Sequence, residues 1–391
     1  MGKAILKTFN VGAGDCIFLI LENNENHFSI MVDCGKLNDE VRNYIDTTLH
    51  RNLDLLIITH IDDDHIDGVK SILSEFDDLK IGHIIYNCAQ GCQLRVPKVL
   101  PDVLLENLNS LRKTDLHVDD KGEVAALKAL TLTEKLLSNE NWRMVWQKQV
   151  GYVTTETTDL ILPYNLGKLI FLSPEPAAIK QLDSYFRKTF NERLYDRYDG
   201  PYENESTIYE IILRYLLVNE APNKSLVVNN VISVNSIKNL ANINPPHSIS
   251  PTNKASLAFL WECGESRILF CGDADPEVIV YNFLRKSNSL AGIAKFDAIK
   301  VAHHGSEHNC GAKFWDTFDS EHIFFTGADN QGKHPSRICI SKVISRNTDK
   351  PRLLHFTKVN SSVKWIDEAP QQIKETLKYQ ITTDCTYEFK Y

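Results

Sequence analysis

A dense group of metal-ligand side chains follows the apolar run Leu53–Ile58. Positions 60 to 67 hold two histidines and four aspartates, in the order His60-Ile-Asp62-Asp-Asp64-His65-Ile-Asp. In extended backbone, residues i and i+2 point to the same side, so His60 and Asp62 can bind one ion. Asp64 and His65 come next and can bind a second ion beside it. Four carboxylates this close repel one another without a cation, so the string predicts a metal site.

Two other interpretations explain this string less well. Aspartate favours the N-terminus of a helix, but that accounts for only one or two of the acids and for neither histidine. A calcium-binding loop needs an acidic twelfth position and a glycine at the sixth. With Asp63 in first place the twelfth residue is Ser74, and with Asp62 in first place the sixth is not glycine.

Three later strings predict further residues of the same site. The apolar segment Arg267–Phe270 leads into Cys271-Gly-Asp273, where a carboxylate can bridge two metal ions. The segment 297–302 leads into an adjacent histidine pair, His303 and His304, followed by Gly305 and Ser306. The string Gly332-Lys-His334-Pro, taken alone, is a weaker indication of a further site residue.

The elements that must position these residues are indicated by the hydrophobic pattern. Short apolar runs separated by turns predict strands at Lys3–Phe9, Cys16–Leu21, Ser29–Asp33, Leu53–Ile58, Ile84–Tyr86, Lys168–Leu172, Ala255–Trp261, Arg267–Phe270, 297–302, 322–326 and Val363–Trp365. Helical spacing predicts helices at Val41–Leu49, after the acidic loop, at 123–138, 176–190 and 207–219, after Pro276, and at 370–378.

The length of 391 residues is enough for two or three domains, but the strand–turn–helix rhythm at both ends favours one domain made of two comparable halves. We expect a first half at about 1–175, an insertion or lid at about 176–252, and a second half at about 253–391. The segment 90–165 is expected to add a further insertion within the first half. The insertion at 176–252 is also a candidate surface for a protein partner, since it contains Tyr185, Tyr195, Tyr198 and Tyr202.

Together, these strings resemble the metallo-β-lactamase superfamily, and most of all the soluble hydrolase domain of ComEC-type competence proteins. The resemblance also includes Asn10-Val-Gly-Ala-Gly-Asp15, Val32-Asp-Cys-Gly35 and Ser256-Leu-Ala-Phe-Leu260, and it covers residues 1–90 and 250–345. It implies an α/β fold, an αββα sandwich of two mixed β-sheets flanked by helices. ComEC proteins also have membrane domains, which this sequence does not contain, so their transport role does not transfer.

The resemblance implies roles for the residues of the motifs. The first-loop metal ligands are His60, Asp62, Asp64 and His65, the bridging carboxylate is Asp273, and the late histidine ligand is His334. Asp64 would also align the attacking water, and His303 or His304 would act at the reacting group. Asp33 and Ser306 would not bind metal themselves but would orient the residues that do. The cofactors implied are two divalent metal ions, Zn²⁺ or Mn²⁺.

This sequence departs from the superfamily pattern at two points. Aspartate replaces the usual histidine at Asp62, which shifts the preference toward harder ions such as Mn²⁺ without excluding Zn²⁺. The mid-chain histidine ligand has no clear counterpart. His247, Asn253 or a water molecule could take its place.

Composition limits the class of protein. A hydrophobic fraction of 43% and a charged fraction of 24% are ordinary for a globular chain. The formal charge of −8 argues against coating nucleic acid by charge alone. Nine scattered cysteines do not indicate a disulfide framework. With no signal peptide and no apolar run of membrane-spanning length, we expect a cytoplasmic protein without membrane contact.

The chemistry these residues predict is metal-assisted hydrolysis. A phosphodiesterase, and above all a nuclease, is the first hypothesis, with a place in bacterial defence against phage implied by the resemblance alone. Hydrolysis of a carboxylic ester, lactone or amide is the second, and a non-catalytic, metal-stabilised interaction module the third. A basic groove would favour a nucleic acid substrate. Its candidates are Arg95, Lys98, Arg187, Arg193, Arg197 and Lys300.

Overall fold

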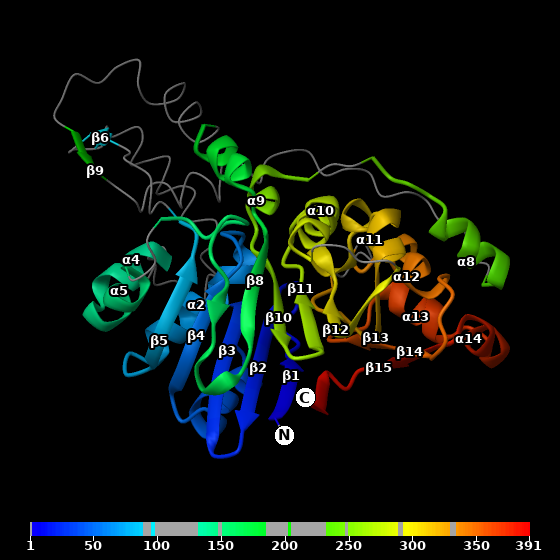
Figure 1. The fold of residues 1–391 in the computed structure, drawn as a ribbon, viewed down its shortest axis with the longest axis horizontal. Coiled ribbons are helices and arrows are strands. Elements are labelled where there is room, and N and C mark those ends of the chain that lie inside the picture. The colour runs from blue at the N-terminus through cyan, green and yellow to red at the C-terminus, as the bar shows by residue number, and fades with distance from the viewer. Residues whose placement is uncertain are drawn as a thin grey trace, which may run out of the picture.

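The computed structural model describes residues 2–88, 95–97, 132–147, 151–184, 202–204, 232–246, 249–287, 292–328 and 334–391. These residues form two mixed β-sheets whose inner faces share one hydrophobic core. Helices cover the outer face of each sheet (Figure 1). The predicted α/β fold, two mixed sheets flanked by helices, is therefore confirmed.

The first sheet has six strands in the order β16-β1-β2-β3-β4-β5. Their bounds are β1 Gly2–Thr8, β2 Cys16–Asn23, β3 Asn26–Cys34, β4 Asn52–Ile58, β5 Lys80–Tyr86 and β16 Thr386–Lys390. Strands β16, β1, β2 and β3 pair antiparallel, whereas β3, β4 and β5 are parallel. The parallel strands are joined through helices, and their carboxyl ends lie at one edge of the sheet.

The second sheet has eight strands in the order β15-β14-β13-β12-β11-β10-β8-β7. Their bounds are β7 Leu160–Ile161, β8 Lys168–Ser173, β10 Ala258–Cys263, β11 Ser266–Phe270, β12 Ala294–Lys300, β13 Phe318–Phe325, β14 Arg352–Phe356 and β15 Tyr379–Thr382. It repeats the plan of the first sheet, with β7, β8, β10 and β11 antiparallel and β11 to β15 parallel. A separate pair joins β6 Arg95–Pro97 to β9 Tyr202–Asn204.

Each sheet has its own set of helices. Those packed on the first sheet are α1 Asp39–Asn43, α2 Asp63–Glu75, α4 Leu132–Ser138 and α5 Glu140–Gln147. Those beside the second sheet are α8 Val234–Ala241, α10 Pro276–Lys286, α11 Ala312–Thr317, α12 Arg337–Ile344, α13 Ser361–Asp367 and α14 Gln371–Leu377 (Figure 1). The short helix α9 Pro251–Lys254 precedes β10.

The core between the sheets is built from alternating positions of the strands. In β1, buried and half-buried residues alternate along the whole strand, and its inward Ala4 and Leu6 are fully buried. From the second sheet come Phe171, Phe259 and Trp261, which are at most 1% exposed. This apolar layer stabilises the sandwich and keeps the two sheet edges that carry the chemistry beside each other.

The predicted strands match the structure, with one exception. Val363–Trp365 lies in helix α13, so the strand predicted there is wrong. The Asn360 side chain accepts hydrogen bonds from the amides of Ser362 and Val363 and so caps the helix. Three apolar side chains then share a buried helical face, Val363, Trp365 and Ile366.

Several other predictions concern residues that are only partly described. Residues 132–138 of the helix predicted at 123–138 form α4, and residues 176–184 of the one at 176–190 are helical. The helix predicted at 207–219 lies outside the described residues. The described cysteines form no disulfide.

The chain crosses between the sheets twice. Strand β8 precedes the predicted insertion but pairs with β10 in the second sheet. The last strand, β16, returns to pair with β1 in the first sheet. The two ends of the chain consequently meet, with the Gly2 amide donating to the Tyr391 carbonyl at 2.9 Å and the Tyr391 amide to Gly2 at 3.0 Å. The division at about 175 and 253 stays a prediction.

Candidate metal centre

The predicted site residues meet where the parallel strands of both sheets end. His60 follows β4, Asp273 follows β11, and the histidine pair follows β12. The carboxyl ends of parallel strands are where open α/β sheets bind ligands. A backbone hydrogen bond of 2.9 Å from Leu257 to the Thr59 carbonyl links the two sheets at this edge.

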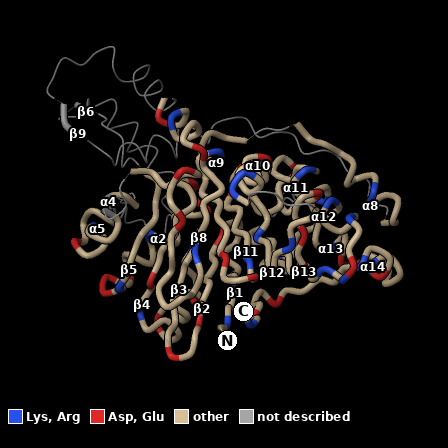
Figure 2. Tube along the Cα trace, in the orientation of Figure 1, with Lys and Arg blue, Asp and Glu red and all other residues tan. Residues whose placement is uncertain are grey.

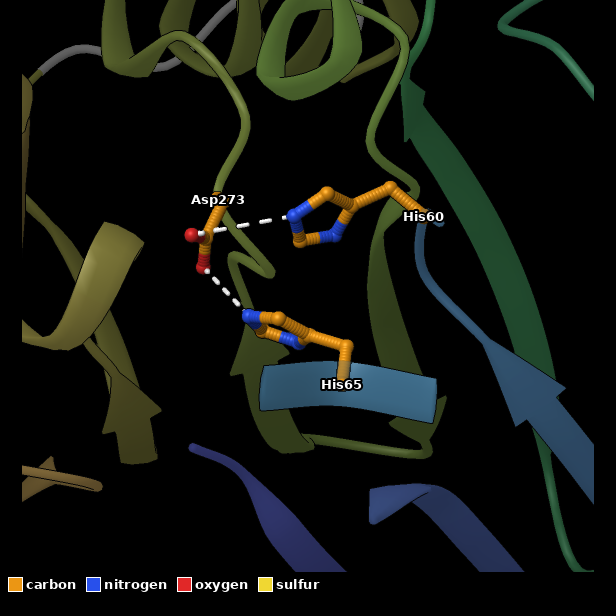
Figure 3. Close-up of side chains that lie close together, drawn as sticks. All are labelled: His60, His65 and Asp273. Carbon is orange, nitrogen blue, oxygen red and sulfur yellow. Dashed lines mark ion pairs between the residues drawn. The ribbon is translucent and has the colours of Figure 1, made fainter. Parts of the chain in front are cut away.

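Asp273 lies at the centre of the cluster (Figure 3). Its Oδ1 is 3.4 Å from His65 Nε2, and its Oδ2 is 3.8 Å from His60 Nε2. The same Oδ2 is 3.6 Å from His303 Nε2 and 3.9 Å from His304 Nε2. Both oxygens of this one carboxylate therefore face imidazole nitrogens.

Among the described residues, the candidate ligand atoms form three groups that share His65, and in each group the atoms lie within 4.8 Å of one another. The groups are His60 with His65 and Asp273, Asp64 with His65 and His304, and Asp15 with Asp33 and His65. Asp62 precedes α2, but its side chain makes no capping hydrogen bond. Its Oδ2 lies 3.5 Å from His60 Nε2 instead, so the carboxylate faces the cluster.

Several atoms of this cluster are buried without a hydrogen-bond partner. They are His60 Nε2, His65 Nε2, Asp273 Oδ1 and His334 Nδ1. Buried polar atoms are normally paired, because an unpaired one loses its hydration without compensation. The donor set of imidazole nitrogen and carboxylate oxygen is also the one that Zn²⁺ and Mn²⁺ accept. The residues therefore fit a divalent metal ion.

The predicted supporting role of Asp33 has a clear geometric counterpart. The fully buried carboxylate accepts from the Thr59 amide at 2.7 Å, the Thr59 hydroxyl at 2.6 Å and His65 Nδ1 at 2.8 Å. The bond to Nδ1 places the proton there and leaves Nε2 free to bind a metal. His60 is oriented in the same way, because its Nδ1 lies 3.0 Å from the Thr59 hydroxyl and 3.4 Å from the Ser256 hydroxyl. Its Nε2 is therefore also left free to bind a metal.

The two adjacent histidines have different surroundings. His303 Nδ1 is 3.0 Å from Asn309 Oδ1 and 3.3 Å from Asn253 Nδ2, and 27% of its side chain is exposed. His304 is 3% exposed, and its Nε2 lies 3.2 Å from Asp64 Oδ2. His304 therefore lies among the ligand atoms, whereas His303 faces the open side of the site.

His334 and Ser306 lie at the periphery. The imidazole ring of His334 is 5.0 Å from that of His303, and burial together with His303 and His304 lowers its pKa to about 3. The Ser306 hydroxyl accepts from the His308 amide at 3.3 Å and so caps a short helical turn. Of the candidates for the mid-chain position, Asn253 is buried beside His303, whereas His247 lies outside the described residues.

Two residues of the site were not predicted from the sequence. Asp15 and Lys300 form an ion pair in which each side chain is only 1% exposed. Lys300 was one candidate for a basic surface groove, and its burial excludes it from such a groove. Its side chain lies inside the protein because β12 alternates and the position faces the core. No sequence signal separated it from Lys295, a lysine of the same strand that lies on the exposed face.

Charge within the cluster shifts the pKa values of its members. Burial raises the pKa of Asp15, but the Lys300 ammonium and His304 outweigh it and leave the pKa below its usual range. Burial lowers the pKa of Lys300, but Asp15 and Asp273 outweigh burial and leave the pKa above its usual value. Burial also lowers the pKa of His304, yet Asp15 and Asp273 raise it to about 10 in the metal-free site. Burial raises the pKa values of Asp64 and Asp273 too, but neighbouring histidines outweigh it and leave both values below their usual range, so these two acids and Asp15 are ionised.

The remaining features expected around the site fall largely outside the described residues. This holds for the side chains of Arg95, Lys98, Arg187, Arg193 and Arg197 and for the tyrosines of the insertion. Along the described chain, acidic and basic positions are intermixed (Figure 2). Among the described residues, none of the helices combines the length and apolar character needed to cross a bilayer.

No family model and no curated protein matches the chain. Among solved structures it is similar to the metallo-beta-lactamase fold protein YhfI from Bacillus subtilis, with 9% sequence identity and a TM-score of 0.35 over the whole of both chains. It is also similar to a mutant of the CmlA beta-hydroxylase, with 10% identity and a TM-score of 0.36. That match covers 99% of this chain and 54% of the CmlA chain.

Proposed function

We propose that this protein is a metal-dependent hydrolase that cleaves phosphodiesters, with nucleic acid as the substrate class. The observation that carries the proposal is the set of buried, unpaired imidazole and carboxylate atoms around Asp273. A structural role alone does not explain ligand atoms left without partners in so acidic a cluster. A bound metal ion would satisfy them.

The charge of the cluster supports two divalent ions rather than one. Five carboxylates meet here, with one ammonium, that of Lys300. They belong to Asp15, Asp33, Asp62, Asp64 and Asp273. With neutral imidazoles, as metal ligation requires, the formal charge is −4, which two divalent ions would neutralise. The oxygen-rich ligand set favours Mn²⁺, and the imidazoles also suit Zn²⁺.

Bound divalent ions would lower the pKa of a water molecule and polarise the attacked phosphoryl group. His60, Asp62, His65 and Asp273 would hold them, together with Asp64 and His304, whose ligand atoms lie beside that of His65. The Asp64 side chain is 38% exposed, so it can accept a hydrogen bond from the attacking water. His303 is the imidazole that reaches the open side, so it can donate a proton to the leaving oxygen. His304 is too buried for that role.

The test is hydrolysis by metal-stripped protein to which Mn²⁺ or Zn²⁺ is returned. The substrates are plasmid DNA, single-stranded DNA, bis(p-nitrophenyl) phosphate, a p-nitrophenyl ester and a lactone. We expect cleavage of the phosphodiesters only with metal, and loss of both bound metal and activity in the double variant His60→Ala, Asp273→Ala. The control is His27→Ala, at an exposed position of β3.

Cleavage of the ester or lactone, but of no phosphodiester with either metal, would contradict the proposed substrate class. Metal binding without cleavage of any substrate would favour the non-catalytic module. Unchanged metal content in the double variant would refute the ligand assignment itself. The proposal also includes a role in anti-phage defence and a protein partner at the insertion 176–252.

A further inference from the structure

Asp15 and Lys300 form a buried ion pair that joins the two halves of the molecule. Asp15 comes from the loop between β1 and β2, and Lys300 is the last residue of β12. Lys300 Nζ contacts Asp15 Oδ2 and donates to the Gly272 carbonyl at 3.0 Å. The pair is almost entirely removed from water.

Each member of the pair also faces a candidate metal ligand. Asp15 Oδ1 lies 3.1 Å from His304 Nδ1, which is also 2.9 Å from the Thr326 carbonyl. The Thr326 carbonyl can only accept a hydrogen bond, so Nδ1 carries the hydrogen, and the Asp15 carboxylate beside it favours the same arrangement. Nε2 is then left toward Asp64. Lys300 Nζ lies 3.9 Å from Asp273 Oδ1, so the ammonium attracts that oxygen and restrains the rotation of the carboxylate.

Stability of the fold does not account for this pair. Desolvating two charges costs free energy, and replacing a buried ion pair with apolar residues of similar volume is often neutral or stabilising. A hydrophobic contact between the same two loops would link the halves equally well. What such a contact could not do is orient an imidazole and a carboxylate.

We propose that Asp15 and Lys300 are positioning residues of the metal centre, which set the ligand atoms of His304 and Asp273 before metal binds. The inference rests on the proposed function in one respect, since it assumes that the centre binds metal. It assigns a role outside the predicted ligand set, and it does not require any particular substrate.

The experiment compares Co²⁺ binding by the wild-type chain and by the double variant Asp15→Leu, Lys300→Met. Leucine has the shape of aspartate and methionine the length of lysine, so the variant removes both charges at similar volume. We expect a metal-free Tm close to that of the wild type, but Co²⁺ affinity lowered about 10- to 100-fold for at least one ion. The visible absorption bands of bound Co²⁺ should also change, because the ligand geometry does.

The matched control is Arg352→Met, Asp319→Leu. This pair also lies in the second sheet, with Arg352 Nη2 2.9 Å from Asp319 Oδ1, but it is far from the ligands in the fold, at the amino ends of β13 and β14. Removing it should leave Co²⁺ affinity and spectrum unchanged. If the first double variant does not fold, Asp15→Asn changes the charge alone, and about a tenfold loss of affinity is expected from it.

Wild-type affinity and spectrum in the folded double variant, or in Asp15→Asn, would overturn the inference. A wild-type chain that binds two Co²⁺ ions but cleaves no phosphodiester would refute the proposed function. The inference on Asp15 and Lys300 would then still be decided by the Co²⁺ affinities and spectra of the variants. A wild-type chain that binds no Co²⁺ would refute both.

Discussion

At the residue scale, the directions of three imidazoles in the centre are set by the partners of their Nδ1 atoms. Asp33 holds His65, Thr59 holds His60, and the Thr326 carbonyl with Asp15 holds His304. Three of the residues involved have left-handed backbone, with φ of 56° at Asp33, 46° at His303 and 51° at His304. Such a conformation costs about 1–3 kcal/mol for a residue other than glycine, and it persists where surrounding contacts require it. We infer that the centre is preorganised at the expense of local strain.

Substituting Asp33→Asn tests this arrangement. The amide nitrogen of asparagine would face His65 Nδ1 or the Thr59 hydroxyl as a second donor, so the orientation of His65 would be lost. We expect metal affinity to fall about 10- to 100-fold, measured by titration calorimetry. Asp54→Asn is the control, because Asp54 Oδ2 accepts from the Ser29 amide and hydroxyl, both at 2.8 Å, in the same pair of strands. Equal losses in both variants would contradict the assignment.

At the element scale, the first turn of α2 lies between two glycine-containing loops. The Asp15 amide donates to the Asp64 carbonyl at 3.1 Å, and the Gly35 amide to the Asp15 carbonyl at 2.8 Å. A Cβ atom on Gly14 or Gly35 would overlap the Asp64 carbonyl oxygen. These loops therefore approach α2 as bare backbone, and the position of Asp64 depends on the absence of side chains there.

Gly14→Ala is predicted to displace the start of α2. Overpacking of this kind costs about 1–3 kcal/mol of unfolding free energy, and the shift of Asp64 should weaken metal binding as well. Both are measurable, by denaturant unfolding and by metal titration. Gly311→Ala is the comparison, since a Cβ there meets no atom within 4 Å. It should cost under about 1 kcal/mol, as expected for an N-cap position, and leave metal binding intact. A Gly14→Ala chain with wild-type stability and affinity would be inconsistent with this packing.

At the scale of the whole molecule, the C-terminal strand links the two sheets through a second pair of histidines, remote from the metal centre. His322 on β13 stacks on Tyr387 of β16, with ring centroids 3.6 Å apart. His322 Nδ1 lies 3.0 Å from His355 Nε2, and His355 Nδ1 lies 2.7 Å from the Asp384 carbonyl. Burial and His355 lower the pKa of His322 to about 4, against the opposing effect of Glu321.

This pair predicts acid sensitivity of the fold. Because the folded pKa of His322 lies below its ordinary value of 6.5, the unfolded chain binds more protons as the pH falls from 6.5 toward 4. The contribution of this one group is about 2 kcal/mol lost between pH 7 and pH 4.5. We expect His322→Phe to unfold with a smaller pH dependence than the wild type, measured by denaturant titration at both pH values. The variant keeps the metal centre, which lies far from His322, so the contribution of the centre cancels in the comparison. An identical pH dependence would show that His322 is not protected from protons in the folded state.

The sequence by itself determined the local parts of the centre. His60, Asp62, Asp64 and His65 lie within six residues on one strand–loop–helix segment. Their convergence follows from backbone geometry that any such segment adopts. Asp273 and the histidine pair were predicted because each follows an apolar run at the end of a strand. Helix α13 was missed because Val363-Lys364-Trp365 alternates apolar and polar residues as a strand does, and three residues are too few to separate a strand from a helix.

Only the tertiary structure decided what depends on contacts between distant segments. Nothing near Lys300 in the sequence separates a surface lysine from a buried one. Its burial follows from the position of β12 within the second sheet, between β11 and β13, where the β1–β2 loop of the first sheet brings Asp15 against it. The sequence likewise could not assign roles within the adjacent pair His303 and His304. Their side chains differ in exposure, at 27% and 3%, because one faces the open edge of the sandwich and the other the loops of the opposite sheet.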